Sequence, residues 1–88
     1  MTYRLEITPA AERDLRRLPA NVRSRVEAKL RGLPDDPRPP GVQKLRVDVE
    51  RYRIRVGNYR LVYDVRDALL LVVVVGAAHR RDVYRNLR

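Results

Sequence analysis

Arginine recurs at every second position in one stretch of this sequence, RYRIRVGNYRLVY, residues 51–63. The Gly-Asn dipeptide inside it favours a two-residue β-turn of the primed type, and this turn predicts a hairpin in which Arg55 lies opposite Arg60. Arg53 then lies on the same face, two residues along the strand. Like charges directly opposite each other destabilise a sheet, but guanidinium groups bind the oxygens of a phosphate in pairs. The stretch therefore predicts a phosphate-binding surface.

The same register divides the hairpin into two faces. The predicted core face carries Tyr52, Ile54, Val56, Tyr59, Leu61, Tyr63 and Val65, and the opposite, open face carries Arg51, Arg53, Arg55, Arg60, Val62 and Asp64. An ordinary solvated face, with arginine stems covering apolar surface, is an alternative interpretation. It explains Arg51, which the ladder places opposite Asp64. It explains Arg53, Arg55 and Arg60 less well, because ordinary solvation mixes charge signs.

The chain as a whole shares this positive charge. Its 88 residues include 20 basic and 11 acidic side chains, for a formal net charge of +9, and all the basic residues except Lys29 and Lys44 are arginines. A charge of this size favours anionic partners, of which nucleic acid is the commonest and an acidic protein the main alternative. The length predicts a single domain, residues 1–88, with one core.

Features that the sequence lacks disfavour several classes of protein. There is no cysteine, so neither a disulfide framework nor a thiolate metal site is expected, and nothing indicates a cofactor. The long apolar run, residues 68–76, is far too short to span a bilayer, and the first residues do not form a secretory signal. We therefore expect a cytoplasmic protein without membrane association.

Two helices and five strands are predicted from periodicity and punctuation. Residues 2–7 alternate between polar and apolar, as in a half-buried strand, and Thr8 is the predicted N-cap of a short helix that Pro19 ends. A second helix begins near Asn21, with an apolar stripe at Val22, Val26, Leu30 and Leu33. The proline-rich residues 34–41 form a connector. Strands are then predicted at 44–47, 51–56, 59–66 and 69–75, with short separators typical of antiparallel neighbours.

The last predicted strand contains LLLVVVV, which is apolar on both faces and therefore typical of the middle of a sheet. The first strand is the one left to pair on its free side. The expected fold class is α+β: a strand, a helical hairpin that provides the crossover, then a four-stranded antiparallel meander with the first strand added beside the last. Residues 77–88 are expected to form a short C-terminal helix or a tail.

This order of elements, with the motifs GNYRLVYDV at 57–65 and HRRDVY at 79–84, resembles the RelE/ParE superfamily of type II toxins across essentially the whole chain. The resemblance implies a RelE-like fold and a cognate antitoxin protein that holds the toxin inactive in a hetero-oligomer. In the RelE branch such proteins enter the ribosomal A site and cut mRNA. In the ParE branch the same fold inhibits DNA gyrase by protein contact.

The RelE-type catalytic pattern combines basic residues on the hairpin with an arginine and a tyrosine near the C-terminus. Carried over by position, the resemblance implies that the catalytic residues are Arg53, Arg55, Arg60, Arg80 and Tyr84, and that RNA is bound by Arg46, Arg53, Arg55, Arg60 and Arg81, with Arg81 as the alternative to Arg80. Because suitable residue types fill these positions, the RelE branch is favoured. Its reaction is attack of a 2′-hydroxyl on the adjacent phosphate.

One departure from the family pattern concerns the general base that would take the 2′-hydroxyl proton. Better-known relatives have lysine where this chain has Arg53 and Arg55, and arginine, with a pKa above about 12, does not lose its proton near neutral pH. Catalysis would then rest on in-line positioning and on electrostatic stabilisation of the phosphorane. His79 is the alternative base, although a lone histidine before a turn is also typical of a capping residue. Tyr84 either stacks on an RNA base or packs the tail onto the sheet.

Three functions remain open on these grounds. The first is a ribosome-dependent mRNA endonuclease toxin, whose partners are the ribosome, mRNA and an antitoxin. The second is a ParE-like inhibitor of DNA gyrase. The third is a basic nucleic-acid-binding domain without toxicity.

Overall fold

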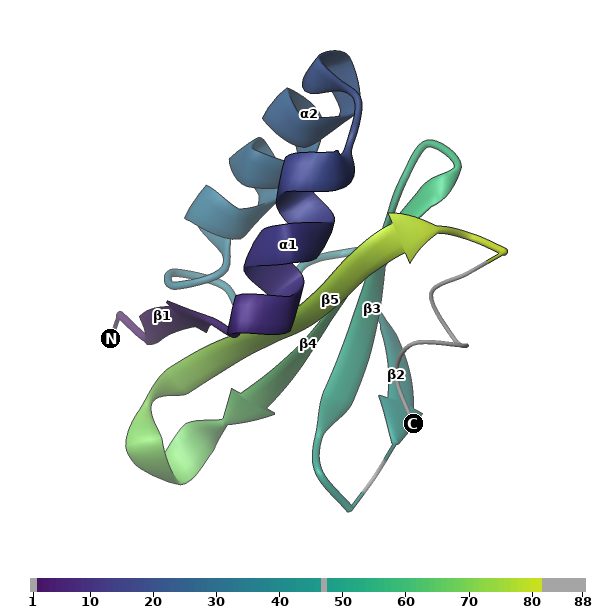
Figure 1. Cartoon of the computed structure of the whole chain (residues 1–88). Helices are drawn as coiled ribbons and strands as arrows, with labels where there is room; N and C mark the ends of the chain where they lie inside the picture. The colour runs from purple at the N-terminus through teal and green to yellow at the C-terminus, as the bar shows by residue number, and fades with distance from the viewer. Residues whose placement is uncertain (1, 47, 82–88) are drawn as a thin grey trace.

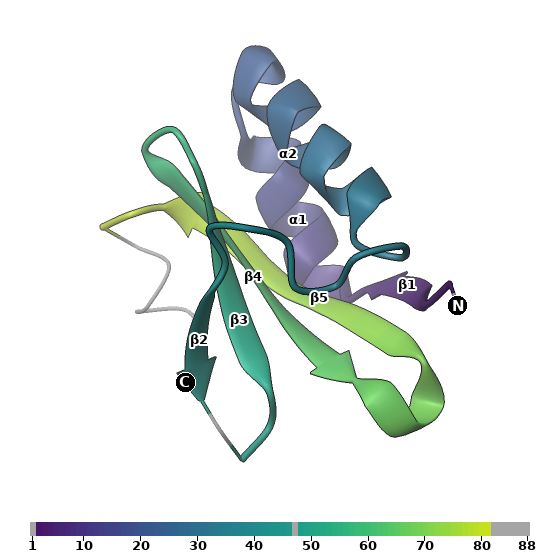
Figure 2. The ribbon, with the colours of Figure 1, turned by 180° about the vertical axis from the view of Figure 1, so that it is seen from behind.

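A computed structural model describes residues 2–46 and 48–81 of the chain. Its elements are β1 (Arg4–Ile7), α1 (Pro9–Arg17), α2 (Ala20–Gly32), β2 (Gln43–Arg46), β3 (Arg51–Val56), β4 (Tyr59–Arg66), a short 3-10 helix η1 (Asp67–Leu69) and β5 (Leu71–His79). The two helices form one layer against the sheet (Figure 1). Seen from behind, the segment between α2 and β2 runs across the sheet to its far edge (Figure 2). The predicted α+β class is confirmed.

The strand order is β1-β5-β4-β3-β2. β1 pairs in parallel with the first half of β5, from Arg4 beside Leu71 to Ile7 beside Val74, and the other pairs are antiparallel. A parallel pair needs a crossover, and α1 with α2 provides it. The predicted meander, with the first strand beside the last, is therefore confirmed, while the predicted C-terminal helix or tail falls largely on 82–88, outside the described residues.

The first helix begins as predicted and the second does not. The Oγ1 atom of Thr8 accepts a hydrogen bond from the Ala11 N–H at 3.1 Å, which caps α1. Asn21, the predicted cap of α2, lies inside the helix because the Arg23 N–H already donates to the Pro19 carbonyl at 2.8 Å. Pro19 is itself the N-cap, and it makes no side-chain capping bond.

The predicted start of the last strand, Leu69, is wrong. Residues 67–69 form η1, Leu70 follows with a φ of +48°, and Leu69 is 60% exposed. The ladder with β4 explains the shift, since it runs from Arg66 beside Leu71 to Tyr59 beside His79, so the connection must be made by the residues between. The first residues of the apolar run, 68–70, therefore precede the strand. The strand ends at His79, four residues past its predicted end.

One hydrophobic core joins the helices to the sheet. Its members include Leu15 and Val26 from the helices and Leu61, Tyr63 and Val72 from the strands, and the last three are completely buried. Burial of these side chains is the main stabilising contribution to such a small fold. None of the helices in the described ranges is long and apolar enough to cross a membrane.

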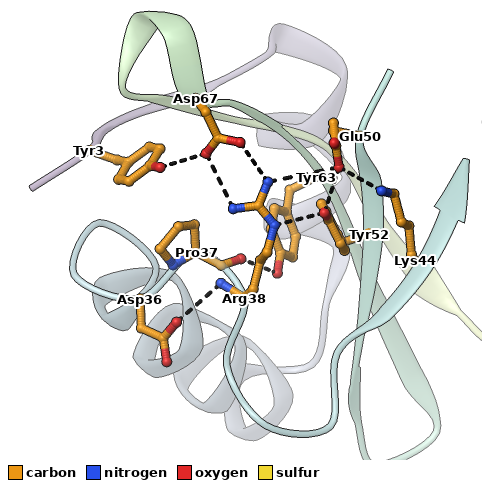
Figure 3. A network of polar contacts seen from close by, with 9 residues as sticks. All are labelled: Tyr3, Asp36, Pro37, Arg38, Lys44, Glu50, Tyr52, Tyr63 and Asp67. Atoms are coloured by element: carbon orange, nitrogen blue, oxygen red, sulfur yellow. Dashed lines mark hydrogen bonds and ion pairs between the residues drawn. The ribbon is translucent and has the colours of Figure 1, made fainter. Parts of the chain in front are cut away.

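A polar network fastens the proline-rich connector to the sheet (Figure 3). Arg38 donates two hydrogen bonds to the Asp67 carboxylate, at 3.2 and 2.8 Å, and a third from Nε to the Tyr52 hydroxyl at 2.7 Å. The Tyr52 hydroxyl donates to Glu50 at 2.6 Å, and Lys44 pairs with the same carboxylate at 2.9 Å. The connector, β2, the β2–β3 loop, β3 and the β4–β5 turn are thus held together at one end of the sheet.

This network shifts the acidity of its members. The hydrogen bond from Arg38, and then that from Tyr3, lowers the pKa of Asp67. The hydrogen bonds from Tyr52 and Lys44 lower the pKa of Glu50. Both carboxylates are therefore held in their charged form.

Candidate nucleic-acid interface

The β3–β4 hairpin has the register that the sequence predicts. Val56 pairs with Tyr59, Arg55 with Arg60 and Arg53 with Val62, around a turn in which Gly57 has a φ of +60°. Glycine adopts this conformation without the steric cost that other residues carry. We call Arg53, Arg55 and Arg60, which the register places on the side away from the helices, the arginine face.

The three alternating arginines of β3 differ in their partners. Arg51 makes a bidentate ion pair with Asp64, at 2.6 and 2.9 Å, as predicted, and this pair raises the pKa of Arg51. Arg53 donates from Nη2 to the Oε1 atom of Gln43. Arg55 is exposed, with no hydrogen bond or ion pair to other described residues. Arg51 is therefore paired with a carboxylate, while Arg55, nearest the turn, is not paired with a described one.

The sequence predicts that the face of the hairpin opposite the core is open, but part of this face is buried. Val62 is completely buried and Asp64 is 4% exposed. The guanidinium of Arg60 is also partly enclosed, because its Nε atom is buried with no hydrogen-bond partner among the described residues. A buried donor without a partner is costly to the folded state.

The end of β5 brings a further arginine to the turn. The Arg80 N–H donates to the Asn58 carbonyl at 2.8 Å, which ties residue 80 to the tip of the hairpin. The side chains of Arg80 and Arg81 are both exposed. Of the predicted C-terminal pair, Tyr84 lies outside the described residues.

Arg46 and His79 are placed less favourably for the predicted roles. Arg46 is held by Asp48, at 3.1 and 2.7 Å, so its charge is compensated. His79 pairs with Tyr59 in the ladder, and the two rings meet edge to face at 5.4 Å. Since Tyr59 belongs to the core side of the hairpin, the structure does not bring His79 to the arginine face.

His79 instead lines a groove of about 400 Å³ between the end of α1 and the end of β5, together with Asp14, Arg17, Leu18, Tyr59, Ala77 and Ala78. Its Nδ1 atom accepts a hydrogen bond from the Arg81 N–H at 3.3 Å. This is the capping geometry that the sequence left as the alternative to a catalytic role.

The chemistry available on the arginine face is electrostatic. The carboxylate of Asp64 lies on the same side of the hairpin, and both of its oxygens accept hydrogen bonds from Arg51. The described residues contain no cluster of three side chains that would hold a metal ion. Guanidinium groups that converge on one surface are suited to binding phosphate and to stabilising added negative charge on it.

Sequence reasoning did not find two partners that tune this surface. Asp48 follows Arg46 by two residues, and this spacing could have indicated the ion pair. Gln43 meets Arg53 only through the β2–β3 register, which shifts between Lys44 and Arg46. A register irregularity of this kind leaves no clear mark in the sequence.

Comparison with known proteins supports the same conclusion as the fold. Residues 5–84 match the family described as ParE toxin of type II toxin-antitoxin system, parDE. The toxin RelG of Mycobacterium tuberculosis is 34% identical over 98% of this chain and 100% of its own length. The mRNA interferase toxin RelE of Escherichia coli is 34% identical over 96% of this chain and 92% of its own.

Two solved structures give the same picture. A mutant of Escherichia coli RelE in the free state superimposes with a TM-score of 0.80 at 31% identity, covering 98% of this chain and 94% of that one. The archaeal RelE–RelB complex from Pyrococcus horikoshii contains a chain that superimposes with a TM-score of 0.80 at 28% identity, covering 91% of this chain and 97% of that one.

The fold and the arginine face thus define a small basic α+β toxin of the type II toxin-antitoxin class. More specifically, the chain belongs to the RelE/ParE toxin family, and the relatives and solved structures described above are named RelE or RelG toxins. The resemblance read from the sequence is confirmed.

Proposed function

We propose that this protein is the toxin of a toxin-antitoxin pair and acts as a ribosome-dependent mRNA endonuclease in the cytoplasm. The observation that carries the proposal is the hairpin register, which sets Arg55 against Arg60 with Arg53 alongside, while residue 80 is tied to the turn. A fold has no structural reason to place like charges opposite each other. A bound phosphate gives one.

In the proposed reaction, the 2′-hydroxyl of one nucleotide attacks the adjacent phosphorus and gives up its proton to water. The bond to the 5′-oxygen of the next nucleotide breaks, this oxygen takes a proton from water, and a 2′,3′-cyclic phosphate is left. The phosphate gains negative charge on the way to the phosphorane. Arg53, Arg60 and Arg80 stabilise that charge and hold the phosphate in line, and Arg55 adds to the field. Because arginine keeps its proton, these residues act by positioning and electrostatics rather than as a general base. Tyr84 stays proposed as a catalytic residue, and Arg46 and Arg81 stay proposed as RNA contacts.

The names of relatives support this function. Escherichia coli RelE is named an mRNA interferase, and relatives from Mycobacterium tuberculosis, Escherichia coli and Pyrococcus horikoshii have been solved as toxin-antitoxin complexes. We propose that this chain likewise forms a hetero-oligomer with a cognate antitoxin and works on mRNA in the ribosome. The alternative is a ParE-type toxin, since the matched family is described by the name ParE; for that branch the resemblance implies inhibition of DNA gyrase.

The deciding experiment induces the protein in a bacterial cell and maps new mRNA ends on a translated and an untranslated copy of one message. Cuts within codons on the translated copy alone support the proposal. Arg60→Ala and Arg80→Ala should abolish both the cuts and growth arrest while preserving antitoxin binding. Arrested DNA synthesis with intact mRNA would overturn it in favour of gyrase inhibition.

Arg66→Ala provides the matched control. Arg66 belongs to the same strand and face as Arg60 but pairs with Leu71 at the other end of the ladder. The control removes the same charge without touching the arginine face, so it should leave cleavage unchanged. Loss of cleavage in this control would mean that total charge, rather than the site, governs activity.

A further inference from the structure

The ion pairs of the described residues all lie in the half of the sheet away from the β3–β4 turn. They join Arg38 to Glu50 and Asp67, Lys44 to Glu50, Arg46 to Asp48, and Arg51 to Asp64. These residues belong to the connector, to β2, to the β2–β3 loop, to β3 and β4 near that loop, and to η1. The basic side chains Arg38, Lys44, Arg46 and Arg51 in that half are therefore paired with carboxylates. Arg4 and Arg66, beside Leu71, have no ion pair with a described residue.

The other half, around the β3–β4 turn, carries uncompensated arginines from both layers of the fold. Arg55 and Arg80 belong to the sheet side. Arg17 comes from the last turn of α1, and Arg25 from the middle of α2. All four are exposed, and none has an ion pair with a described residue.

Arg25 shows how closely the helical layer approaches the hairpin. Its Nη1 atom lies 3.5 Å from the position that a Cβ atom would take at Gly57, so the guanidinium rests over the turn itself. Arg17 lies beside the same end of the sheet, in the groove that Tyr59 and His79 line. The acidic side chain of this groove, Asp14, is engaged by the Ala77 N–H at 3.1 Å.

We propose that Arg17 and Arg25 form a second phosphodiester-binding surface, on the helical side of the turn, which continues the arginine face around the tip of the hairpin. The inference extends the proposed function and rests on it for the identity of the partner as RNA. One hairpin turn separates Arg55 and Arg60 from the guanidinium of Arg25, so an RNA backbone that crosses the tip meets arginines on both sides. Charge complementarity selects this occupant, because phosphodiesters carry one negative charge per nucleotide and arginine binds them well.

A structural explanation accounts for part of the arrangement. A cation in the last turn of a helix is favourable to the helix dipole, which explains Arg17 taken alone. It does not explain Arg25, which lies in the interior of α2 and reaches over the turn. The helix dipole therefore accounts for Arg17 but not for Arg25, although both residues lie on the same surface.

The test measures binding of a short single-stranded RNA, and of ribosomes, as a function of salt for an Arg17→Gln, Arg25→Gln double variant. Each lost phosphate contact reduces the slope of log K against log salt by about 0.7 on single-stranded RNA, so the double variant should lose about 1.4. The matched control is Arg16→Gln with Arg31→Gln, which removes two exposed arginines from the same helices beside Glu27 instead of the turn. The control should keep the wild-type slope.

The two arms identify the source of the phosphates. A reduced slope with the free oligonucleotide places the strand that is cut on this surface, and a reduction seen only with ribosomes places folded ribosomal RNA there. Wild-type slopes in both arms would overturn the inference, as would a loss confined to antitoxin binding. If the wild-type protein leaves translated mRNA uncut but the slopes still fall, the proposed function fails and the RNA surface stands.

Discussion

Arg55 and Arg60 are direct partners in the β3–β4 ladder, so two positive charges face each other across adjacent strands of the hairpin. Such a pair costs the folded state between a few tenths and about 1 kcal/mol. At this position, the positive charge that favours phosphate binding lowers the stability of the folded protein.

Replacement of Arg55 by glutamine should therefore make the protein more stable and less active. We expect the free energy of unfolding to rise by up to about 1 kcal/mol. We expect cleavage of translated mRNA to fall on the order of 10²-fold, as for loss of one charge-stabilising donor. Urea denaturation and a cleavage assay measure the two effects. Arg66→Gln, whose ladder partner is Leu71, should change neither; a destabilised Arg55→Gln protein would contradict the repulsion.

The ion pair between Arg51 and Asp64 predicts the reverse pattern. Their side chains are 18% and 6% exposed, so removal of one partner leaves the other charge poorly solvated. Arg51→Met should cost on the order of 3 kcal/mol, measured by denaturant unfolding. Cleavage per folded molecule should stay near wild type, because the guanidinium of Arg51 is already occupied. A large loss of cleavage at unchanged stability would instead place Arg51 among the phosphate contacts.

The network around Arg38 predicts a loss of stability in acid. Asp67 has a lower pKa in the folded protein than in the unfolded chain, chiefly through its bonds to Arg38. The stabilisation is therefore present above the ordinary carboxylate pKa of about 4 and is lost as the pH falls through the lowered value. The melting temperature should drop more steeply below pH 4 in the wild type than in Arg38→Gln. Arg31→Gln should keep the wild-type profile, and parallel profiles for all three proteins would exclude this role of Arg38.

The position of His79 predicts that it is dispensable for cleavage. Loss of a general base costs about 10²–10⁴-fold in rate. His79→Gln should lose less than tenfold and keep the wild-type dependence of rate on pH, because the ring packs on Tyr59 at the helical side of the hairpin. A rate that becomes independent of pH between 5 and 8 in the variant would restore His79 as the base.

The sequence was informative wherever one local rule decided the structure. The Gly-Asn turn and the alternation around it set the hairpin register, and with it the Arg55–Arg60 and Arg51–Asp64 pairs. Thr8 and Pro9 set the start of α1 by capping chemistry. In these places, turn type, polarity pattern and hydrogen bonding favour the same answer.

It was less informative where distant segments decide. The start of β5 depends on how many residues β4 pairs, so the apolar run alone placed it too early at Leu69. The side on which His79 lies depends on the ladder with Tyr59 across an irregularity in β5 that the sequence does not reveal. The contact of Gln43 with Arg53 has the same origin, in the shifted register of β2.

The sheet has one further consequence, for the order in which the protein is made. β5, the last described strand along the chain, lies between β1 and β4. The core therefore cannot close until residues 71–79 have left the ribosome that synthesises them, and β1 has no strand to pair with before then. The sheet of this protein is therefore completed only after nearly all of its described residues have been made.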